Sequence, residues 1–244
     1  MRELGNHIKQ ICALDQSVLF ISDLHEPFSH PDSHAFLKAI KDNYKPDIII
    51  NMGDEIDSSQ ISFHPSDSAL PNADKELELA IEELQKLRDI FPKMYLCESN
   101  HGSLAYRKAK YHGIPIRQLR DLHELYETPQ WSWHAEIMLE THNGFVTVVH
   151  GRTGSRGKLA LEQGNSAVQA HFHSTAEISW IRSTMNTRFN MICGCLVDEK
   201  HLAFAYGKNI AKKPIQCVGW LNEYGEPCLI RMMLDKHGRW IGKL

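Results

Sequence analysis

Hydrophobic residues in the first hundred positions follow two alternating patterns. Short apolar runs at 17–22, 47–51 and 93–98 are typical of strands that are buried on both faces. Between these runs, residues 33–43 and 72–91 place apolar side chains at helical spacing. A succession of strand, helix and strand predicts a parallel sheet whose connections are right-handed.

The pattern becomes rich in short strands after residue 127. Residues 102–127 are predicted to be helical, and residues 135–150 predict a β-hairpin whose turn is Asn143-Gly144. Further strands are predicted at 167–171, 176–183, 188–197, 201–207, 215–222 and 227–234. We therefore expect a single α/β domain over residues 1–244, with a parallel βαβ first half and a β-rich second half.

Side chains that can bind metal lie beside the ends of several predicted strands. They are Asp23, His25, Asp54, Asn100, His150, His171 and His173. Ligands at the C-terminal ends of parallel strands fit the rule for open α/β sheets. Oxygen ligands combined with imidazoles suit Mn²⁺, Fe or Zn²⁺ better than Ca²⁺ or Mg²⁺. Two such ions roughly 3.5–4 Å apart are a common device for in-line attack on phosphorus.

The seven residues fall within five ordered blocks. These read Asp23-Leu24-His25, Gly53-Asp54-Glu55-Ile56-Asp57, Ser99-Asn100-His101-Gly102, His150-Gly151 and Ala170-His171-Phe172-His173. A single Asp after a strand is more often a turn or capping residue, and a single His is more often structural. Five blocks in this order are more specific. They resemble the signature of the calcineurin-like metallophosphoesterases, which runs D-x-H, G-D-x-x-D, G-N-H-[DE], a lone His and G-H-x-H.

The resemblance implies both a fold and an activity. The fold is a four-layer β-sandwich flanked by helices, as in the purple acid phosphatases and repair nucleases of this superfamily. The activity is hydrolysis of phosphoric esters by a metal-bridging hydroxide, since a bound metal can lower the pKa of water from about 15.7 to near 7. Ser99, Gly102 and Ala170 depart from the signature, yet none of these departures removes a ligand. Ser58 stands where the Ser/Thr protein phosphatase branch has Arg, which argues against that branch.

The resemblance also assigns the ligands to two divalent ions, with Mn²⁺ favoured and Fe, Zn²⁺ or Ni²⁺ as alternatives. The first ion would be held by Asp23, His25 and His173. The second would be held by Asn100, His150 and His171. Asp54 would bridge both ions, because a carboxylate offers two charged oxygens.

Two further residues are expected to act in catalysis. By resemblance, His101 would donate a proton to the leaving oxygen, a role worth about 10²–10⁴-fold in rate. Asp57 would orient a ligand by a hydrogen bond, because such partners fix metal-binding groups. The alternative for Asp57 is a helix N-cap.

Basic residues near these blocks are candidates for contacts with the substrate. Arg152, Arg156 and Lys158 follow His150 in the glycine-rich segment 151–158. Glycines let backbone N–H groups approach oxyanions, which favours a phosphate or nucleic-acid contact, and the alternative is a surface turn. Arg107, a few residues after His101, is a weaker candidate of the same kind.

Bulk properties limit where the protein acts. Residues 1–100 carry 9 basic and 18 acidic side chains, and the chain as a whole lacks the basic excess of a dedicated nucleic-acid binder. The six cysteines form no C-x-x-C pair and mostly lie in apolar stretches, so we expect reduced thiols. The first sixteen residues lack the apolar core of a signal peptide, and no apolar run reaches 18 residues. We therefore expect a cytoplasmic protein without a membrane partner.

The sequence leaves several functions open. The leading hypothesis is a dinuclear metal-dependent phosphodiesterase, with nuclease action on nucleic acid or action on a nucleotide as versions of it. One alternative is a phosphomonoesterase or protein phosphatase, and another is a binding scaffold of the same fold with weak catalysis. A homodimer also stays open, although no heptad pattern supports it. The polar loop 58–73 is long enough to cover the site.

Overall fold

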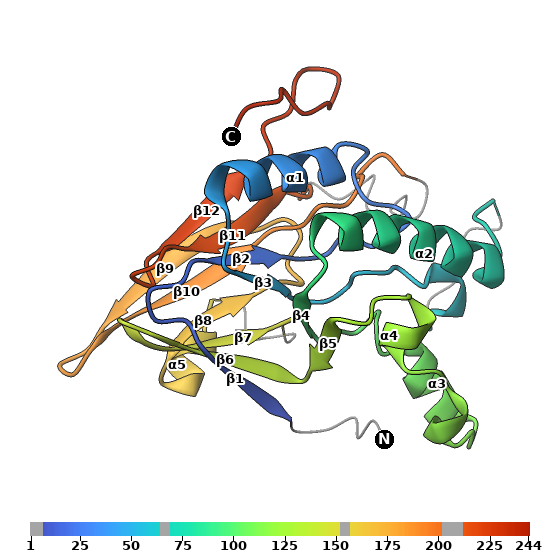
Figure 1. Ribbon diagram of the computed structural model, residues 1–244, viewed down its shortest axis with the longest axis horizontal. Helices are drawn as coiled ribbons and strands as arrows, with labels where there is room; N and C mark the ends of the chain where they lie inside the picture. Colours follow the sequence, from blue (N-terminus) through green and yellow to red (C-terminus); the bar gives the residue numbers. More distant parts are fainter. Residues whose placement is uncertain (1–6, 64–68, 152–156, 202–211) are drawn as a thin grey trace.

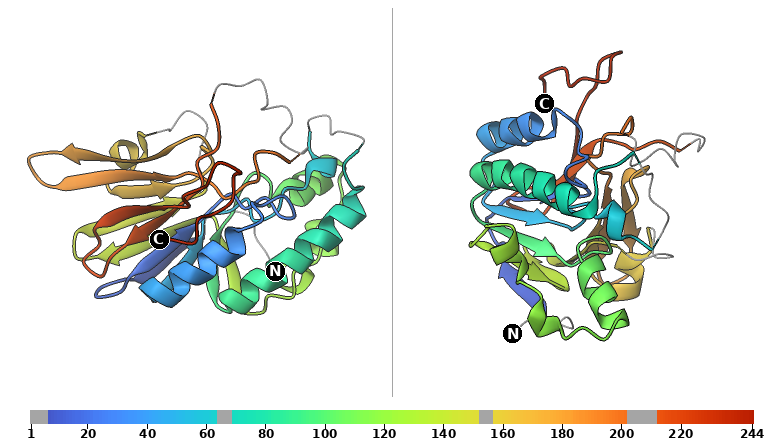
Figure 2. Two further views of the ribbon diagram at one scale, coloured as in Figure 1. Left: turned by 90° about the horizontal axis from the view of Figure 1, so that it is seen from above. Right: turned by 90° about the vertical axis from the view of Figure 1, so that its right-hand side faces the viewer.

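A computed structural model describes residues 7–63, 69–151, 157–201 and 212–244. Within these residues, twelve strands form two six-stranded sheets that pack face to face (Figure 1). Helices flank the pair of sheets, as the two views in Figure 2 show. None of the described helices is long and apolar enough to cross a membrane.

The first sheet contains the parallel strands that the apolar runs predict. Its order is β12-β11-β2-β3-β4-β5. Strands β2 to β5 pair in parallel, whereas β11 pairs antiparallel with both β2 and β12. The strands are β2 (Val18–Ile21), β3 (Ile48–Asn51), β4 (Met94–Cys97), β5 (Trp131–His134), β11 (Cys217–Leu221) and β12 (Pro227–Arg231). The two helices predicted between β2, β3 and β4 are α1 (Ser33–Tyr44) and α2 (Ala73–Ile90). The βαβ prediction is therefore confirmed.

The second sheet is mixed and comes mainly from the β-rich second half. Its order is β1-β6-β7-β8-β10-β9. The strands are β1 (Ile8–Cys12), β6 (Glu136–Thr141), β7 (Gly144–Val149), β8 (Ser166–Gln169), β9 (Ala176–Arg182) and β10 (Thr187–Cys193). β1 was not predicted, because its exposed and half-buried residues do not form an apolar run. It lies at the sheet edge and pairs in parallel with β6.

Two other sequence predictions concern the hairpin turn and the strand predicted at 201–207. The β6–β7 hairpin is present, but its loop is His142-Asn143, and Gly144 already pairs with Thr141. The predicted turn at Asn143-Gly144 was therefore one residue too late, because Gly144, at a φ of 97°, serves as the first residue of β7. The strand predicted at 201–207 lies almost wholly outside the described residues, since only His201 belongs to them.

The core is divided into layers by the side-chain alternation of the buried strands. In β2, Val18 and Phe20 join the cluster between the two sheets, whereas Leu19 and Ile21 join the cluster under α1 and α2. Helices α3 (Leu104–Tyr111) and α4 (Leu122–Leu125), with the short 3₁₀ helices η1 (Ser59–Ile61) and η2 (Ile116–Gln118), lie on the same side of the molecule as α2. Helix α5 (Leu159–Gln163) packs on β8 and β10 with its own small apolar cluster. The layers are thus helices, sheet, sheet and helix, as predicted.

Candidate metal centre

The predicted ligands come together at the C-terminal ends of strands from both sheets. Asp23, Asp54 and Asn100 follow β2, β3 and β4 in the first sheet. His150 directly follows β7, and His171 follows β8 in the second sheet. Asp23, Asp54 and His150 are almost completely buried, so charges and imidazoles are held where water cannot screen them.

The loops that carry the ligands have an unusual backbone. Asp23, His25, Asp54 and His171 have φ values of 48°, 52°, 50° and 69°, in the left-handed region that non-glycine residues seldom adopt. Hydrogen bonds hold two of the loops together, because the His25 N–H donates to the Asp54 carbonyl over 2.9 Å. Strained backbone of this kind persists only where its surroundings enforce it, and it is concentrated at functional sites.

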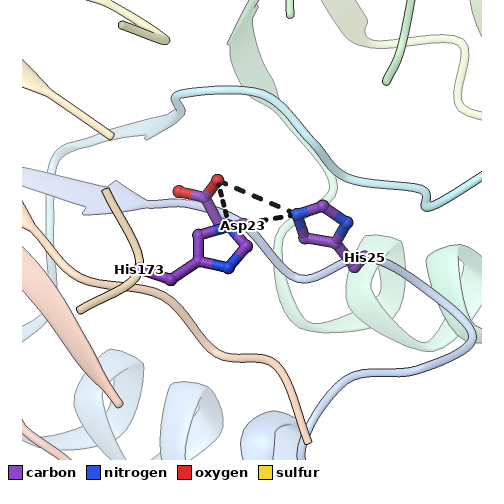
Figure 3. Close-up of side chains that lie close together, drawn as sticks. All are labelled: Asp23, His25 and His173. Atoms are coloured by element: carbon purple, nitrogen blue, oxygen red, sulfur yellow. Dashed lines mark hydrogen bonds and ion pairs between the residues drawn. The ribbon is translucent and has the colours of Figure 1, made fainter. Parts of the chain in front are cut away.

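One group of ligand atoms is formed by Asp23, His25 and His173 (Figure 3). Nε2 of His173 lies 3.1 Å from Oδ1 of Asp23 and 3.3 Å from Nε2 of His25. Nδ1 of His25 lies 2.7 Å from Oδ1 of Asp57, so the carboxylate holds the proton on Nδ1 and directs the Nε2 lone pair into the group. The predicted orienting contact of Asp57 is thus made to a ligand, whereas the cap position of η1 is taken by Ser58.

A second group is formed by Asp54, His150 and His171, with Asn100 beside it. Nε2 of His150 lies 2.7 Å from Oδ1 of Asn100 and 3.2 Å from Oδ2 of Asp54. The same Asp54 oxygen lies 3.5 Å from Nε2 of His25 in the first group. Asp54 therefore stands between the two groups, which is where a bridging carboxylate belongs.

The donor chemistry of the second group calls for a cation. Nδ1 of His150 lies 3.0 Å from the Met52 carbonyl, which can only accept, so Nδ1 carries a proton. In neutral His150 the Nε2 atom is then an acceptor that faces two further acceptors, the oxygens of Asn100 and Asp54. Three acceptors at these distances repel one another unless a proton or a metal ion lies among them. The residues present therefore fit a divalent ion.

The electrostatics of the site express the same need for positive charge. Burial would lower the pKa of His150, but the charge and hydrogen bond of Asp54 raise it to about 9. Burial would likewise raise the pKa of Asp54, yet His150 and other nearby imidazoles hold it well below its usual value. The pKa of His171 is lowered by burial and by the neighbouring His150. A bound cation would replace the proton of His150, since metal ligands must be deprotonated.

His101 lies next to both groups and forms a third cluster of possible ligand atoms with His25 and Asp57. Its backbone N–H donates to Oδ1 of Asp54 over 3.0 Å. Its Nδ1 is hydrogen-bonded to the Asp57 carbonyl and lies 3.6 Å from Oδ1 of the same residue. The His101 side chain remains about a quarter exposed, so Nε2 is the ring nitrogen available to an incoming molecule.

The structure explains two of the departures from the signature. The Ser99 hydroxyl accepts the N–H of Asp54 over 2.9 Å and the N–H of Gly102 over 3.1 Å. A Cβ atom at Gly102 would lie 3.0 Å from that hydroxyl and 3.4 Å from a carboxylate oxygen of Glu55. Glu55, which is fully buried and also accepts from Trp133 Nε1, thus occupies space that a side chain at position 102 would need. Ser99 and Glu55 were not predicted as site residues, because their contacts join blocks that are distant in sequence.

Of the four predicted substrate-binding residues, the structure describes Lys158 and Arg107. Arg152 and Arg156 lie outside the described residues. Lys158 is exposed at the N-terminus of α5, and among the described contacts none joins its side chain to the ligands. Arg107 donates from Nη2 to the Asn100 carbonyl over 2.6 Å and stacks near the Phe63 ring. Arg107 therefore supports the ligand loop directly, a role that its position in the sequence did not indicate.

Two sheets whose strand ends bring buried Asp, His and Asn side chains into two adjoining groups define a protein with a candidate two-metal centre. The sequence profile of the calcineurin-like phosphoesterases matches residues 17–189, and the chain belongs to this family. No curated protein sequence matches the chain significantly.

Three solved structures resemble the chain at low sequence identity. The phosphoesterase Yfce from E. coli is 16% identical, with 89% of this chain and 100% of that chain covered and a TM-score of 0.47. Vps29 from Chaetomium thermophilum is 11% identical, with 92% of each chain covered and a TM-score of 0.48. Vps29 from Entamoeba histolytica, solved with Zn²⁺, is 13% identical, with 88% and 97% covered and a TM-score of 0.46.

Proposed function

We propose that the protein is a dinuclear metal-dependent phosphoester hydrolase that acts on phosphodiesters. The observation that carries this proposal is the position of Asp54 between two groups of buried ligands. Around it, Asp57 orients His25 and the Met52 carbonyl orients His150. Two metal ions held in this way, when bound, supply Lewis-acid stabilisation and an activated water.

The chain itself would supply alignment and a proton. Water provides the oxygen that joins phosphorus and loses one proton, while the bond from phosphorus to the ester oxygen breaks. The ester oxygen takes a proton from Nε2 of His101 in its imidazolium form, while Nδ1 keeps its own proton in the hydrogen bond to the Asp57 carbonyl. The proton released by the water restores His101, so the net reaction consumes one water and yields an alcohol and a phosphomonoester.

The preference for diesters is supported by the contacts of the two basic candidates that the structure describes, Arg107 and Lys158. A monoester carries up to two negative charges, whereas a diester carries one and requires less compensation. Arg107 donates to the Asn100 backbone and Lys158 has no contact with the ligands among the described residues. The proposal includes nuclease action as one version, together with a homodimeric assembly and a cytoplasmic location.

The proposal is tested by hydrolysis of bis-p-nitrophenyl phosphate and p-nitrophenyl phosphate by protein loaded with Mn²⁺. We expect faster cleavage of the diester, complete loss with a chelator, and close to two ions per chain by mass spectrometry of the metals. A preference for the monoester would move the assignment to a phosphatase. A folded protein with well under two ions per chain and no cleavage of either ester would indicate a binding scaffold instead.

A further inference from the structure

A cavity of about 370 Å³ lies beside His101, on the side formed by η1, α2, α3 and α4. Its volume falls within the range of about 300–1,000 Å³ that is usual for small-molecule sites. His101 and Gly102 form one wall, and Ser58, which follows Asp57 in the chain, forms another. The cavity is therefore continuous with the residues that hold the proposed proton donor.

The accessible walls of this cavity are mainly apolar. They include Ile61 of η1, Leu77 of α2 and Leu125 of α4, all of which are half-buried. Side chains in this state leave apolar surface exposed to water, and a ligand that covers the surface removes it from water. Buried Tyr126 lies beneath and contributes further apolar surface.

Apart from His101, the charged groups that line the described part of the cavity are acidic. Among the described lining residues there are three carboxyl groups and neither a Lys nor an Arg. Asp74 is exposed at the rim, while Glu26 and Glu76 are buried. The carboxylate of Glu76 accepts the N–H of Ser59 over 2.7 Å and so fixes η1, and Oε1 of Glu26 lies 3.3 Å from Nε2 of His34. An anionic ligand would thus enter an apolar space whose rim carries the exposed carboxylate of Asp74.

The position of the cavity follows the direction of the proposed reaction. In an in-line displacement the leaving oxygen departs opposite the attacking oxygen. His101 contacts Asp54 and Asp57 of the ligand loops, and together with Gly102 and Ser58 it also lines the cavity. A proton donated by His101 would reach an ester oxygen whose substituent extends into the cavity.

We propose that this cavity receives the alcohol portion of the substrate and selects an apolar aryl or alkyl alcohol that carries no negative charge. The inference rests on the proposed function for the identity of the ligand, but not for the existence of the binding site. It favours a small-molecule diester over a polynucleotide, because the next phosphate of a nucleic acid would lie near Asp74, and the described lining residues include neither a Lys nor an Arg to compensate it.

Binding of three alcohols of similar shape tests the proposal directly. The probes are 4-ethylphenol, tyramine and 4-hydroxyphenylacetate, which are neutral, cationic and anionic at pH 7. Saturation-transfer NMR with unmodified protein, with and without Mn²⁺, measures each dissociation constant. We expect the first two to bind and the anionic probe to bind about tenfold more weakly or worse. Equal binding of all three, or binding of the anionic probe alone, would overturn the proposal.

Two pairs of variants locate the binding. Ala105 is exposed on α3 at the cavity wall, so Ala105→Trp should fill the space without disturbing the core, and Ala35→Trp on α1 is the matched control. We expect loss of 4-ethylphenol binding in the first variant and no change in the control. Asp74→Asn should narrow the difference between tyramine and 4-hydroxyphenylacetate, whereas Asp89→Asn, exposed on the same helix, should not. Unchanged binding in Ala105→Trp would place the probes elsewhere and refute the assignment.

The outcomes separate this inference from the proposed function. Probe binding that Ala105→Trp abolishes, in a protein that hydrolyses no ester, would retain the cavity as a binding site and reject the hydrolase. Metal-dependent hydrolysis without probe binding would retain the hydrolase and reject the cavity as the alcohol site. Tight, salt-dependent binding of single-stranded DNA at the same cavity would favour the nuclease version and contradict the selectivity proposed above.

Discussion

Two regions meet at His101, and they differ in almost every physical respect. The candidate metal centre is polar, buried and built from strand ends. Hydrogen bonds to Asp57 and to the Met52 carbonyl fix the imidazoles of His25 and His150. The cavity is apolar, open and built from helices and η1. The first region can provide reaction chemistry but little selectivity, because phosphate oxygens are common to all phosphoesters. The second can provide selectivity but no chemistry of its own.

The difference also shows how tightly each region is specified. A ligand in the metal centre cannot change without leaving a buried charge or acceptor unbalanced, which is costly in a low-dielectric interior. A wall residue such as Leu77 or Leu125 can be exchanged for another apolar side chain at small cost. The predictions below test this contrast, beginning with the largest expected effect.

Replacing the carboxylate between the two ligand groups should have the largest effect. Asp54→Asn keeps the shape of the side chain but removes the negative charge that faces His150 and His25. We expect Mn²⁺ content to fall from about two ions per chain to one or fewer, and hydrolysis of the diester to fall by more than the roughly 10–100-fold typical of a lost outer partner. Metal analysis and steady-state kinetics measure both. A variant that keeps two ions and more than a tenth of its activity would refute the bridging role.

Removing the imidazole at the junction of the two regions should affect the chemical step alone. His101→Asn is expected to lower kcat by about 10²–10⁴-fold for a diester with a poor leaving group, such as an alkyl alcohol. The loss should be much smaller for p-nitrophenyl esters, because p-nitrophenolate leaves without a proton. Metal content should stay unchanged, since the two groups around Asp54 and Asp23 keep all their ligand atoms in this variant, and His101 belongs only to the third cluster with His25 and Asp57. Equal losses for both leaving groups would contradict the role of proton donor.

Weakening the orientation of one ligand should have an intermediate effect. Asp57→Asn loses the charged partner of His25 Nδ1, which holds the Nε2 lone pair toward Asp23 and His173. We expect Mn²⁺ affinity to fall by about 10–100-fold. Activity should recover when Mn²⁺ is raised, which calorimetric titration and kinetics at several metal concentrations would show. A loss that excess metal does not restore would assign Asp57 to the chemical step instead.

The raised pKa of His150 predicts how metal affinity depends on pH. Without metal, its pKa is about 9, above the ordinary value near 6.5, so His150 is protonated at neutral pH. The proton contributes stability that is fully present below about pH 6.5 and is lost as pH rises through about 9. Metal binding must displace this proton, so Mn²⁺ affinity should rise about tenfold per pH unit between pH 7 and 8.5. A flat titration over this range would show that His150 is already neutral.

The two regions were not equally accessible to sequence analysis. Asp23, Asp54 and His150 could be predicted as ligands because apolar strands place the next polar residue at a sheet edge, and the order of the blocks is specific. The cavity could not be predicted, because Leu77 follows the same helical spacing as the core residues Ala80 and Leu84. Spacing along a helix shows which face is apolar, but not whether another element covers it.

Contacts between distant blocks were equally hidden from the sequence. Ser99 and Gly102 could be recognised as departures from the signature, but their effect depends on the distance to Glu55 and Asp54, which only the folded chain defines. Likewise, Arg107 was predicted to contact the substrate, and its hydrogen bond to the Asn100 carbonyl could not be foreseen from the sequence. The sequence identified unusual residues correctly and could not identify their partners.

The smallest effect concerns the hydroxyl that links the two regions. Ser99→Ala removes the acceptor for the N–H groups of Asp54 and Gly102, and therefore loosens a ligand on one side and a cavity wall on the other. Two N–H groups that lose their partner should lower the free energy of unfolding by about 1–3 kcal/mol, which urea denaturation measures. Activity should fall by only a few-fold, because Asp54 keeps its contacts with His150 and His25.

Ser103→Ala is the matched control on the same turn. Its hydroxyl donates to a single carbonyl at 3.4 Å, so its loss should change neither the free energy of unfolding nor the activity measurably. If both variants behaved alike, the Ser99 hydroxyl would contribute no more than an exposed hydroxyl. That result would contradict the coupling between the candidate metal centre and the cavity at Gly102.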